Sequence, residues 1–352
     1  MEPALYRAME DSPYKMSPYV NVFRTGPEQG FEGFYLYPRY LAGYTSTFHI
    51  LAFTVETHML KPYHERVLST KYLLKEVLKF TSGHAEAIGR NKQQAIAATM
   101  AKQEHVLHWN IDTTRYDTIS FTGYRAKGEK SVVTGLERYR YDREDPWTAD
   151  IPFYNYFTPG RTVTAPRYYI VPFAWEEVIK RLRCSNIEMV RMGHDTTLLT
   201  EVYTIESYGT LQTPYNGHYR HYNTEVRKSM VEITVYAEDY IIPVAQRGAD
   251  FIVQTLEPQG YDSFFSWNFF DAILSRKEYF SPYLFEDTAM ELLEEDPVLR
   301  SAFTKKRAED PDFAGNSYAQ LSWIYDRSPW SEPTYRRYPV FRYNGNIFPG
   351  TP

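Results

Sequence analysis

The sequence predicts a mixed α/β chain, in which a strand–turn–helix piece precedes a β-rich antiparallel module and C-terminal helices. The apolar run Phe48–Val55 is followed by a turn at Lys61–Pro62 and an amphipathic stretch from His64 to Phe80. A short run rich in β-branched and aromatic residues is typical of a strand buried on both faces. Segments of alternating polarity between residues 118 and 240, divided by Gly, Pro and Asn, favour an antiparallel sandwich or barrel-like module. After Pro243 the pattern becomes helical again.

Composition bounds the class of protein. With 352 residues, 43% of them hydrophobic, the chain has room for one large domain or two to three ordinary ones. No run of about eighteen apolar residues occurs, so we expect no membrane span. The net charge is −5 and lysine and arginine form no basic tract, which argues against a general nucleic-acid binder. The first residues lack the basic and apolar regions of a signal peptide.

The individual elements follow from local patterns. Before residue 48 we expect a short strand at Tyr19–Phe23 and a Gly- and Tyr-rich loop from Gly26 to Gly43. A second, polar helix is expected over Ala85–Leu107. Further strands are expected at 118–124, 138–141, 162–164, 199–205 and 231–236, and further helices at 174–182, 249–256, 269–274 and 287–293. The charged stretch 305–312 is expected to be a solvated loop or helix face, and the Pro- and Tyr-rich tail from Trp330 an extended strap on the surface.

These patterns divide the chain into three parts. Residues 1–108 form the α/β part, residues 109–245 the β-rich accessory domain, and residues 246–352 a helical and extended region packed on it. Parallel sheets place ligand sites beyond the carboxyl ends of their strands, and Glu56 follows the expected strand at such an end.

A short motif around this strand resembles a known family. The motif looks like the end of the catalytic domain of carboxypeptidase A-like zinc carboxypeptidases. It consists of Gly43-Tyr44, the strand ending in Glu56-Thr57-His58, Leu60–Tyr63 and Arg66-Val67. The segments 165–172 and 255–258 resemble the C-terminal region of some large bacterial members. The resemblance implies that residues 1–108 are an α/β fragment, the end of a carboxypeptidase-like mixed sheet with helices, in a protein that hydrolyses peptides.

The resemblance also implies roles for three residues. By its place in the motif, Glu56 is the general base that moves a proton between water and the leaving amine; the alternative is a strand-end glutamate paired with Lys61 or Arg66. Tyr44, with Tyr40 as its rival, matches a substrate-binding tyrosine, against an ordinary loop tyrosine packed on the sheet. Arg39 is placed to meet a substrate carboxylate in a bidentate pair, against a plain surface arginine.

The sequence departs from the family in its metal ligands. In the family, a His-x-x-Glu motif and a later histidine bind the zinc ion, and all three ligands precede the catalytic glutamate. In this sequence, His49 is the only histidine among residues 1–55, and no His-x-x-Glu motif occurs anywhere. The Asn-Arg pair that holds the substrate carboxylate is missing as well. We therefore expect an N-terminally truncated copy rather than a domain that lost its metal, with zinc as the cofactor of the full-length protein, no metal in this chain and no hydrolysis by it.

Other candidate sites have plain alternatives. His105 and His108, beside Glu104, and His218 and His221 have the i, i+3 spacing of helical metal ligands, but coincidence explains such pairs as well. Cys184 is the only cysteine, and we expect an inert residue at a helix end rather than a nucleophile. The aromatic run 264–270 is expected to be core rather than a stacking platform.

A second class of function stays open. Aromatic residues make up 17% of the chain, which suits strands and also suits a binding face. The alternative function is a non-catalytic binding protein whose β-rich module holds a glycan or a cell-wall peptide. A parallel sheet cut to two strands would leave an apolar edge, so we expect self-association through the first eighty residues. For the full-length protein we expect an exported, periplasmic or extracellular location.

Overall fold

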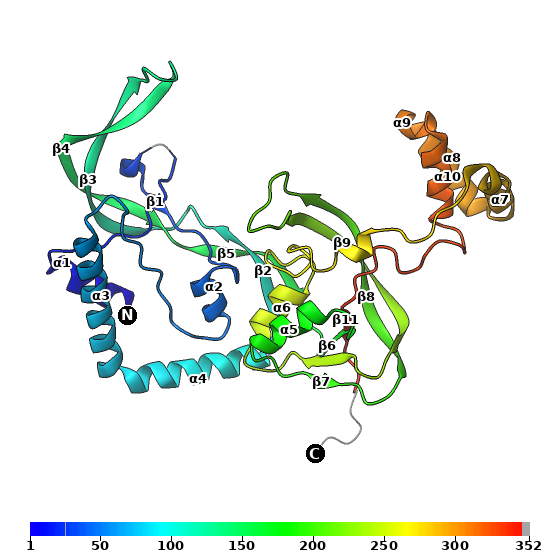
Figure 1. Ribbon diagram of the computed structural model, residues 1–352, viewed down its shortest axis with the longest axis horizontal. Coiled ribbons are helices and arrows are strands. Elements are labelled where there is room, and N and C mark those ends of the chain that lie inside the picture. Colours follow the sequence, from blue (N-terminus) through cyan, green and yellow to red (C-terminus); the bar gives the residue numbers. More distant parts are fainter. Residues whose placement is uncertain (25, 347–352) are drawn as a thin grey trace.

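A computed structural model describes residues 1–24 and 26–346 of this chain, and Figure 1 shows its elements. The α-helices are α1 Glu2–Glu10, α2 Leu41–Ser46, α3 Tyr63–Gly83, α4 Ala85–Ala101, α5 Glu176–Cys184, α6 Ala249–Leu256, α7 Pro282–Glu295, α8 Pro297–Glu309, α9 Pro311–Ala314 and α10 Ser317–Tyr325. The strands are β1 Phe31–Glu32, β2 Glu104–Ile111, β3 Asp117–Lys130, β4 Glu137–Tyr154, β5 Phe157–Thr164, β6 Tyr168–Val171, β7 Val190–Arg191, β8 Thr196–Thr210, β9 His221–Val235, β10 Tyr240–Pro243 and β11 Phe341–Tyr343. Short 3₁₀ turns lie at Pro27–Gln29 and Asp271–Leu274.

The fold is mixed α/β with several sheets. The largest is a six-stranded antiparallel sheet in the order β7-β10-β6-β11-β8-β9. A second sheet has the order β1-β4-β3, in which β1 pairs with β4 in parallel, and β2 pairs with β5 in a two-stranded ribbon. The helices α7 to α10 form a separate cluster after the sheets, as Figure 1 shows. The predicted fold class is confirmed at this level.

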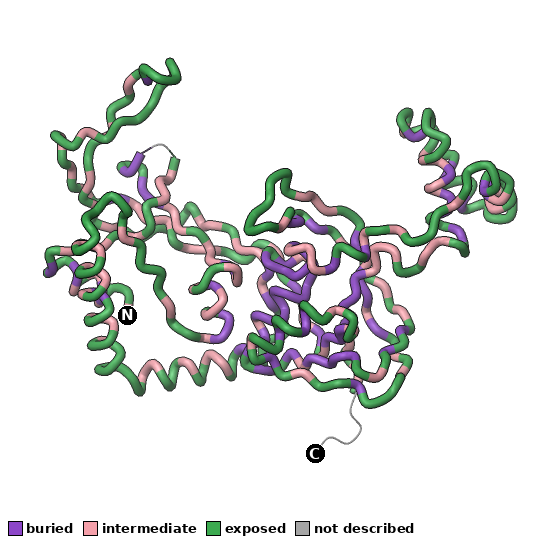
Figure 2. The backbone as a smooth tube through the Cα atoms, viewed as in Figure 1, coloured by how far each residue is buried: buried purple, intermediate pink, exposed green. Residues whose placement is uncertain are grey.

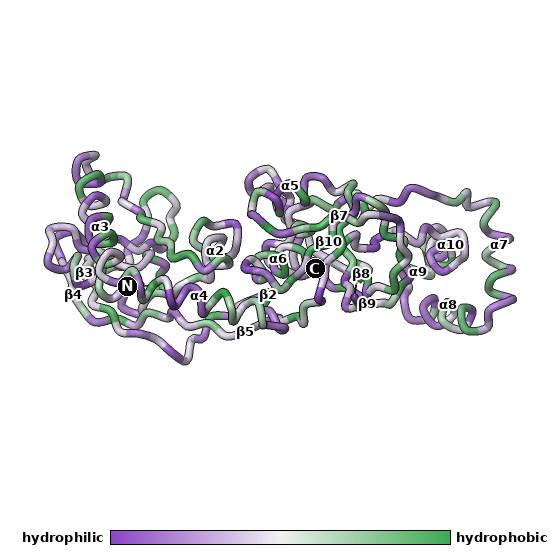
Figure 3. Tube along the Cα trace, turned by 90° about the horizontal axis from the view of Figure 1, so that it is seen from below, coloured by the Kyte–Doolittle hydropathy of each residue, from purple (hydrophilic) through white to green (hydrophobic). Residues whose placement is uncertain are grey.

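The main core lies between the six-stranded sheet and helices α5 and α6. Buried residues from β6, β8, β10, α5 and α6 pack together there, and Phe48 and Leu107 from the N-terminal part join them. Figure 2 shows the buried positions concentrated in this central region, and hydrophobic segments gather where β8, β10 and α6 lie together (Figure 3). The core thus draws on all three predicted parts of the chain, and the division at 108 and 245 stays a prediction.

The C-terminal helices are started by specific caps. The carboxylate of Asp296 accepts hydrogen bonds from the N–H groups of Val298 and Leu299, at the start of α8, and Asn316 accepts one from Ala319 in the same way at α10. Such caps satisfy amide groups that have no partner within the helix. Phe285, Phe303 and their neighbours then form a small core of their own.

The predicted strand at 48–55 is wrong. Phe48 is buried and closes the turn after α2, but from Ile50 to Glu56 the chain is irregular and almost entirely exposed. His49 has a φ of +57°, and the N–H of Ile50 bonds back to the carbonyl of Thr45. A strand forms only when a neighbouring strand satisfies its backbone groups, and no described residue pairs with this segment. The two-stranded parallel edge expected here is therefore not formed, and self-association stays a prediction.

Three further predictions are corrected: the end of one helix, the course of the tail and one short strand. The helix predicted to reach Leu107 ends at Ala101, because residues 104–111 pair with β5 as strand β2. The tail is not a surface strap: residues 341–343 form β11, between β6 and β8 in the six-stranded sheet. Tyr19–Phe23 is also no strand, apart from a single bridge between Val22 and Phe31.

Most other element predictions are confirmed. The alternating segments lie in β3, β4, β5, β8 and β9, and the helix predicted at 249–256 is α6. The helices predicted at 174–182 and 287–293 overlap α5 and α7, and 305–309 is the last part of α8. Phe264, Phe265 and Phe270 are buried core residues, as expected of the aromatic run. Among the described residues, none of the helices combines the length and the apolar character that crossing a bilayer requires.

Candidate functional site

Glu56, the predicted general base, lies in the irregular connection between α2 and α3. Its side chain is exposed and makes no hydrogen bond or ion pair with any described residue. The pairing with Lys61 or Arg66 that formed the alternative is likewise not made among the described residues. The cavity beside the six-stranded sheet, described below, has no lining residue from this connection. Its catalytic role stays a prediction.

Tyr44 lies on α2 and packs against the main core. Its ring meets that of Phe251 edge-on, with centroids 5.5 Å apart, and the ring of Phe48 at 5.2 Å. Tyr44 is half-buried, so part of the ring belongs to the contact between α2 and α6. Its substrate-binding role stays a prediction, which this packing does not test.

Arg39 meets a carboxylate in a bidentate way, and that carboxylate belongs to the chain itself. Its Nε donates to Asp262 Oδ1 at 2.8 Å and Oδ2 at 3.1 Å, and its backbone N–H donates to Oδ2 at 2.9 Å. Both side chains are buried, and Arg220 approaches Asp262 Oδ1 at 3.5 Å. Around the guanidinium stand the rings of Tyr261 at 4.8 Å and Trp267 at 5.4 Å. Arg39 is therefore a largely buried arginine whose guanidinium is paired with Asp262.

The two histidines of the first candidate pair contact different parts of the chain. His105 and His108 lie on strand β2, not on a helix. Successive side chains of a strand point to opposite faces, so the spacing of helical metal ligands does not apply to them. His105 is buried with Nδ1 2.8 Å from Asp250 Oδ1, whereas His108 Nε2 lies 2.8 Å from the carbonyl of Gln259. Burial favours a higher pKa for Asp250, but its hydrogen bonds with His105 and Lys102 outweigh this and lower the pKa to about 2. These contacts are structural.

No described residues form a zinc site. Among residues 1–24 and 26–346, there is no group of three or more His, Cys, Asp and Glu side chains that could hold a metal ion. His221, the second candidate pair's buried member, is held by Thr210 and Asp271 at 2.9 and 3.0 Å. The described residues do not fit the zinc centre that the resemblance implies, so no step of the proposed chemistry passes through a metal.

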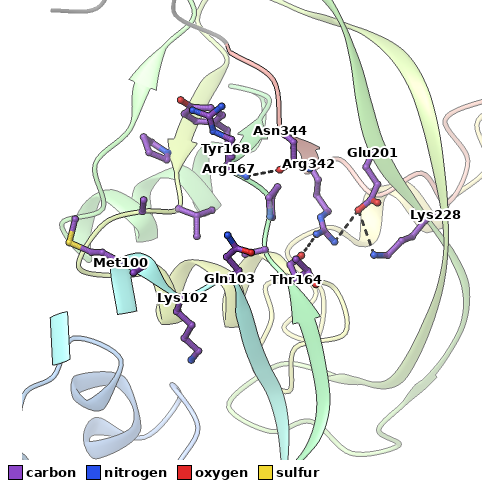
Figure 4. A pocket seen from close by; sticks show the side chains of 16 residues that line it. Met100, Lys102, Gln103, Thr164, Arg167, Tyr168, Glu201, Lys228, Arg342 and Asn344 are labelled. Carbon is purple, nitrogen blue, oxygen red and sulfur yellow. Dashed lines mark hydrogen bonds and ion pairs between the residues drawn. The ribbon is translucent and has the colours of Figure 1, made fainter. Parts of the chain in front are cut away.

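A cavity lies in the β-rich part, next to the six-stranded sheet. It has a volume of about 570 Å³ and is lined by residues from the end of α4, β6, β8, β9, β10 and β11. Figure 4 shows its polar side chains. Four cationic side chains reach it, and Glu201 is the one carboxylate among its lining residues; the cations are Lys102, Arg167, Lys228 and Arg342. Met100, Pro243 and Val244 give it an apolar wall.

Arg342 forms the floor of this cavity. Its Nη1 lies 3.1 Å from Glu201 Oε1 and 3.4 Å from Glu257 Oε1, and its Nη2 donates to the carbonyl of Thr164. Lys228 Nζ lies 3.6 Å from the same oxygen of Glu201. Figure 4 shows Arg342 and Lys228 converging on Glu201 from β11 and β9. Arg342 Nε is buried without a hydrogen-bond partner among the described residues.

Behind the floor lies the buried carboxylate of Glu257. Tyr203 donates to it at 2.8 Å, and Tyr169 donates to its other oxygen. Burial raises the pKa of Glu257, and Arg342 and the two hydroxyls oppose the rise. Burial lowers the pKa of Arg342, but Glu257 and its neighbours outweigh it and raise that pKa. The network thus keeps a buried positive charge and a buried negative charge in contact.

This site joins segments that the sequence singled out without a role. Tyr169 comes from the segment 165–172, and Glu257 from 255–258, where it ends α6. Arg342 was missed because the tail was interpreted as a strap. The available signal was weak: Val340, Phe341 and Tyr343 are residue types that are enriched in strands.

Comparison with known proteins gives a partial relative. It is named Carboxypeptidase 2, from Trichophyton tonsurans, and 115 residues of this chain are 28% identical to it. The match covers 31% of this chain and 21% of the relative, so the chain spans about a fifth of that protein's length. No family model matches this chain, and no solved structure does.

The relative supports the carboxypeptidase resemblance for part of the chain. It reaches neither the identity nor the coverage that would place this protein in the family. The structure adds the cationic cavity, which no part of the resemblance explains. The partial similarity to a carboxypeptidase and the cationic cavity are therefore two separate observations.

Proposed function

We propose that this chain is the C-terminal part of a carboxypeptidase-type peptidase, with Glu56 as its general base. The observation that carries the proposal is the state of residues 50–56: a strand-like, apolar sequence that is irregular and almost entirely exposed. Ile50, Leu51, Phe53 and Val55 all lie in solvent. Burial of such side chains is worth about 1.5–3 kcal/mol each, so this segment favours pairing with a sheet that the described residues do not provide.

The proposal gives Glu56 a chemical task. A carboxylate beside the scissile bond takes a proton from the attacking water and passes it to the leaving amine. Glu56 is exposed and has no hydrogen-bond or ion-pair partner among the described residues, so its carboxylate is free to meet such groups when another part of the protein packs on this segment. On its own, the chain is expected to hydrolyse no peptide, because the described residues offer no zinc site of the family type.

The first experiment reads the coding DNA upstream of the Met1 codon. An in-frame His-x-x-Glu there is expected, and its absence from any open frame joined to this one would contradict the truncation. In the longer product, Glu56→Gln is expected to lower kcat by about 10²–10⁴-fold, the usual contribution of a general base. Glu65→Gln, the same change nine residues later, is the matched control and should keep full activity.

The cavity favours a second candidate, a non-catalytic binding protein. Its cations outnumber its single carboxylate, and its wall is apolar. This combination suits the free carboxylate end of a peptide, such as a cell-wall peptide, better than a neutral glycan, because charge-assisted hydrogen bonds select anions. In this reading Glu56 plays no part in binding.

Binding measurements separate the two candidates. Short peptides with a free C-terminus are titrated against the whole chain by calorimetry, and their C-terminal amides serve as the ligand control. Lys228→Ala and Arg167→Ala are expected to weaken binding, whereas Lys180→Ala on α5 should not. Binding that survives Glu56→Gln supports the second candidate; equal affinity for acid and amide would contradict it.

A further inference from the structure

A long hairpin, formed by β3 and β4, projects away from the body of the molecule. Strands β3 and β4 pair from Asp117↔Phe153 at the base to Lys130↔Glu137 at the end. Figure 1 shows this hairpin extending beyond the sheets and helices around it, and Figure 2 shows it exposed over most of its length. Its base is covered by Phe31 of β1, which is fully buried and meets Phe121 edge-on. The outer half has no such cover among the described residues.

The tip of the hairpin is an ordered turn. The N–H of Ser131 donates to the carbonyl of Leu136 at 2.8 Å, and Gly135 donates back to Ser131 at 2.9 Å. The hydroxyl of Ser131 accepts from the N–H groups of Val133 and Thr134 at 3.2 and 3.1 Å. Gly135 has a φ of +70°, which glycine adopts without strain. The polar groups of the turn are therefore bonded inward.

The side chains left in solvent at this tip are aliphatic. Val132 is 98% exposed, Val133 89% and Leu136 71%. Exposed turns are normally built from polar residues, glycine and proline. Apolar side chains gathered on one projection, rather than scattered over a surface, mark a site of contact with something apolar.

Below the tip lies a collar of basic and tyrosine side chains. Lys130, Arg138 and Arg140 are exposed there, and Tyr139 and Tyr141 lie beside them in solvent. Lys130 makes no ion pair with a described residue. An aliphatic end followed by tyrosines and cations is the order in which side chains meet the acyl, interfacial and headgroup layers of a bilayer.

Acidic residues on the same hairpin do not cancel this collar. The carboxylate of Glu129 forms an ion pair with Arg138, and its Oε2 lies 3.8 Å from Nη1 of Arg140. Lys127 likewise pairs with Asp142 at 2.8 Å. Between residues 127 and 142 there are four lysines and arginines and three acidic residues, which leaves one positive charge in excess near the tip.

The length of the hairpin separates the tip from the charge of the whole chain. β3 has 14 residues, which span roughly 45 Å at about 3.3 Å per residue. At physiological ionic strength the Debye length is about 8 Å, so the field of the body is screened at that distance. The net charge of −5 therefore does not keep the tip from an anionic surface.

We propose that the tip of the β3–β4 hairpin docks on an anionic lipid bilayer. Val132, Val133 and Leu136 enter the boundary between headgroups and acyl chains, while the basic collar contacts the lipid phosphates and carboxylates. The hairpin itself stays outside the hydrocarbon, since its open edges need hydrogen-bond partners. This inference is independent of peptide hydrolysis and of the cavity.

The test is flotation of the whole chain with lipid vesicles. Vesicles of phosphatidylcholine with about 30% phosphatidylserine should carry the protein at low salt, because anionic headgroups attract the collar. Binding to pure phosphatidylcholine should be at least about tenfold weaker, and it should fall as salt is raised to about 1 M, where the Debye length is about 3 Å. A chain that floats with neither vesicle overturns the proposal.

Paired variants show whether the tip is responsible. The double change Val132→Asp and Val133→Asp should reduce binding at least about tenfold, by removing apolar contact and adding repulsion. The matched control, Met290→Asp with Val298→Asp, makes the same charge change at exposed positions of α7 and α8 and should bind like the parent. Equal loss in both doubles, or none in the tip double, contradicts the assignment, as does capture by a protein partner at the tip without vesicle binding.

A fluorescent probe provides a second readout. In the variant Cys184→Ser with Val133→Cys, an environment-sensitive dye on the new thiol reports on the tip alone. Its emission should shift to the blue with anionic vesicles and stay unchanged with phosphatidylcholine. The same dye on the exposed natural Cys184 should not respond, and a response there alone would overturn the proposal.

Discussion

Arg342 on β11 lies opposite Glu201 on β8, and its guanidinium Nη1 reaches the Glu201 carboxylate at 3.1 Å. The contact exists because residues 341–343 insert between β6 and β8, far from them in sequence. The same side chain reaches Glu257, which ends α6. One arginine from the C-terminal tail thus joins the sheet, the helix and the cavity.

Removing Glu257 should destabilise the protein strongly. Glu257→Ala leaves Arg342 and two tyrosine hydroxyls buried without their shared acceptor, and breaking a buried ion pair from one side costs about 3–5 kcal/mol. Urea unfolding followed by circular dichroism measures the loss. Glu86→Ala, at an exposed position of α4, should change the free energy of unfolding by less than about 0.5 kcal/mol. Equal midpoints for the two variants would contradict the role of this network.

Asp250 should make stability fall in acid. Its folded pKa is about 2, below the value of 3.8 for a free aspartate, so the folded state holds the proton less readily than the unfolded state. The stabilisation is fully present above pH 4 and is lost as the pH falls from about 4 towards 2; a shift of this size corresponds to about 2 kcal/mol. Asp250→Asn should flatten the pH dependence of unfolding in this window. A slope unchanged by the substitution would contradict the prediction.

Arg39 should prove a stability residue. Arg39→Lys keeps the charge but cannot place two donors on Asp262, and the bidentate geometry of arginine is not reproduced by an ammonium group. We expect a loss of about 2 kcal/mol or more, within the range for disturbing buried ion pairs, measured by chemical unfolding. Arg7→Lys, on the exposed side of α1, is the control. If Arg39→Lys changed ligand binding and left stability intact, the substrate role predicted from the sequence would return.

The connection that carries Glu56 should exchange its amide hydrogens quickly. The N–H groups of residues 51–57 have no hydrogen-bond acceptor among the described residues, and such groups lack protection. Mass spectrometry should find this segment exchanged at the first time point, while α6 stays protected. Protection that rises with protein concentration would indicate self-association through this segment, and Leu51→Asp with Phe53→Asp should then remove it. Full protection in a dilute monomer would contradict the structure of the connection.

Local patterns were enough wherever an element is decided by its own residues. The alternation in 199–205 and 231–236 identified β8 and β9. The apolar stretch 249–256 identified α6, which is buried on nearly all sides. The pattern failed at 48–55, where an apolar run needs a partner strand to become a strand, and at 341–343, where a short tail segment pairs with strands formed far earlier in the chain. The spacing of residues within a segment does not predict which distant strand it pairs with.

For the candidate site, the sequence by itself determined the residue types and the strand and helix periods. It indicated a motif around Glu56 that resembles zinc carboxypeptidases, a β-rich part, and segments containing Tyr169 and Glu257. Only the tertiary structure decided that Arg39 is occupied by Asp262, that Glu56 lies apart from the cavity, and that Arg342 closes the cavity floor. The physical reason is that a buried charge is stable only beside its counter-charge. Strand order and helix packing, rather than any local pattern, bring together residues that are 85 to 223 positions apart.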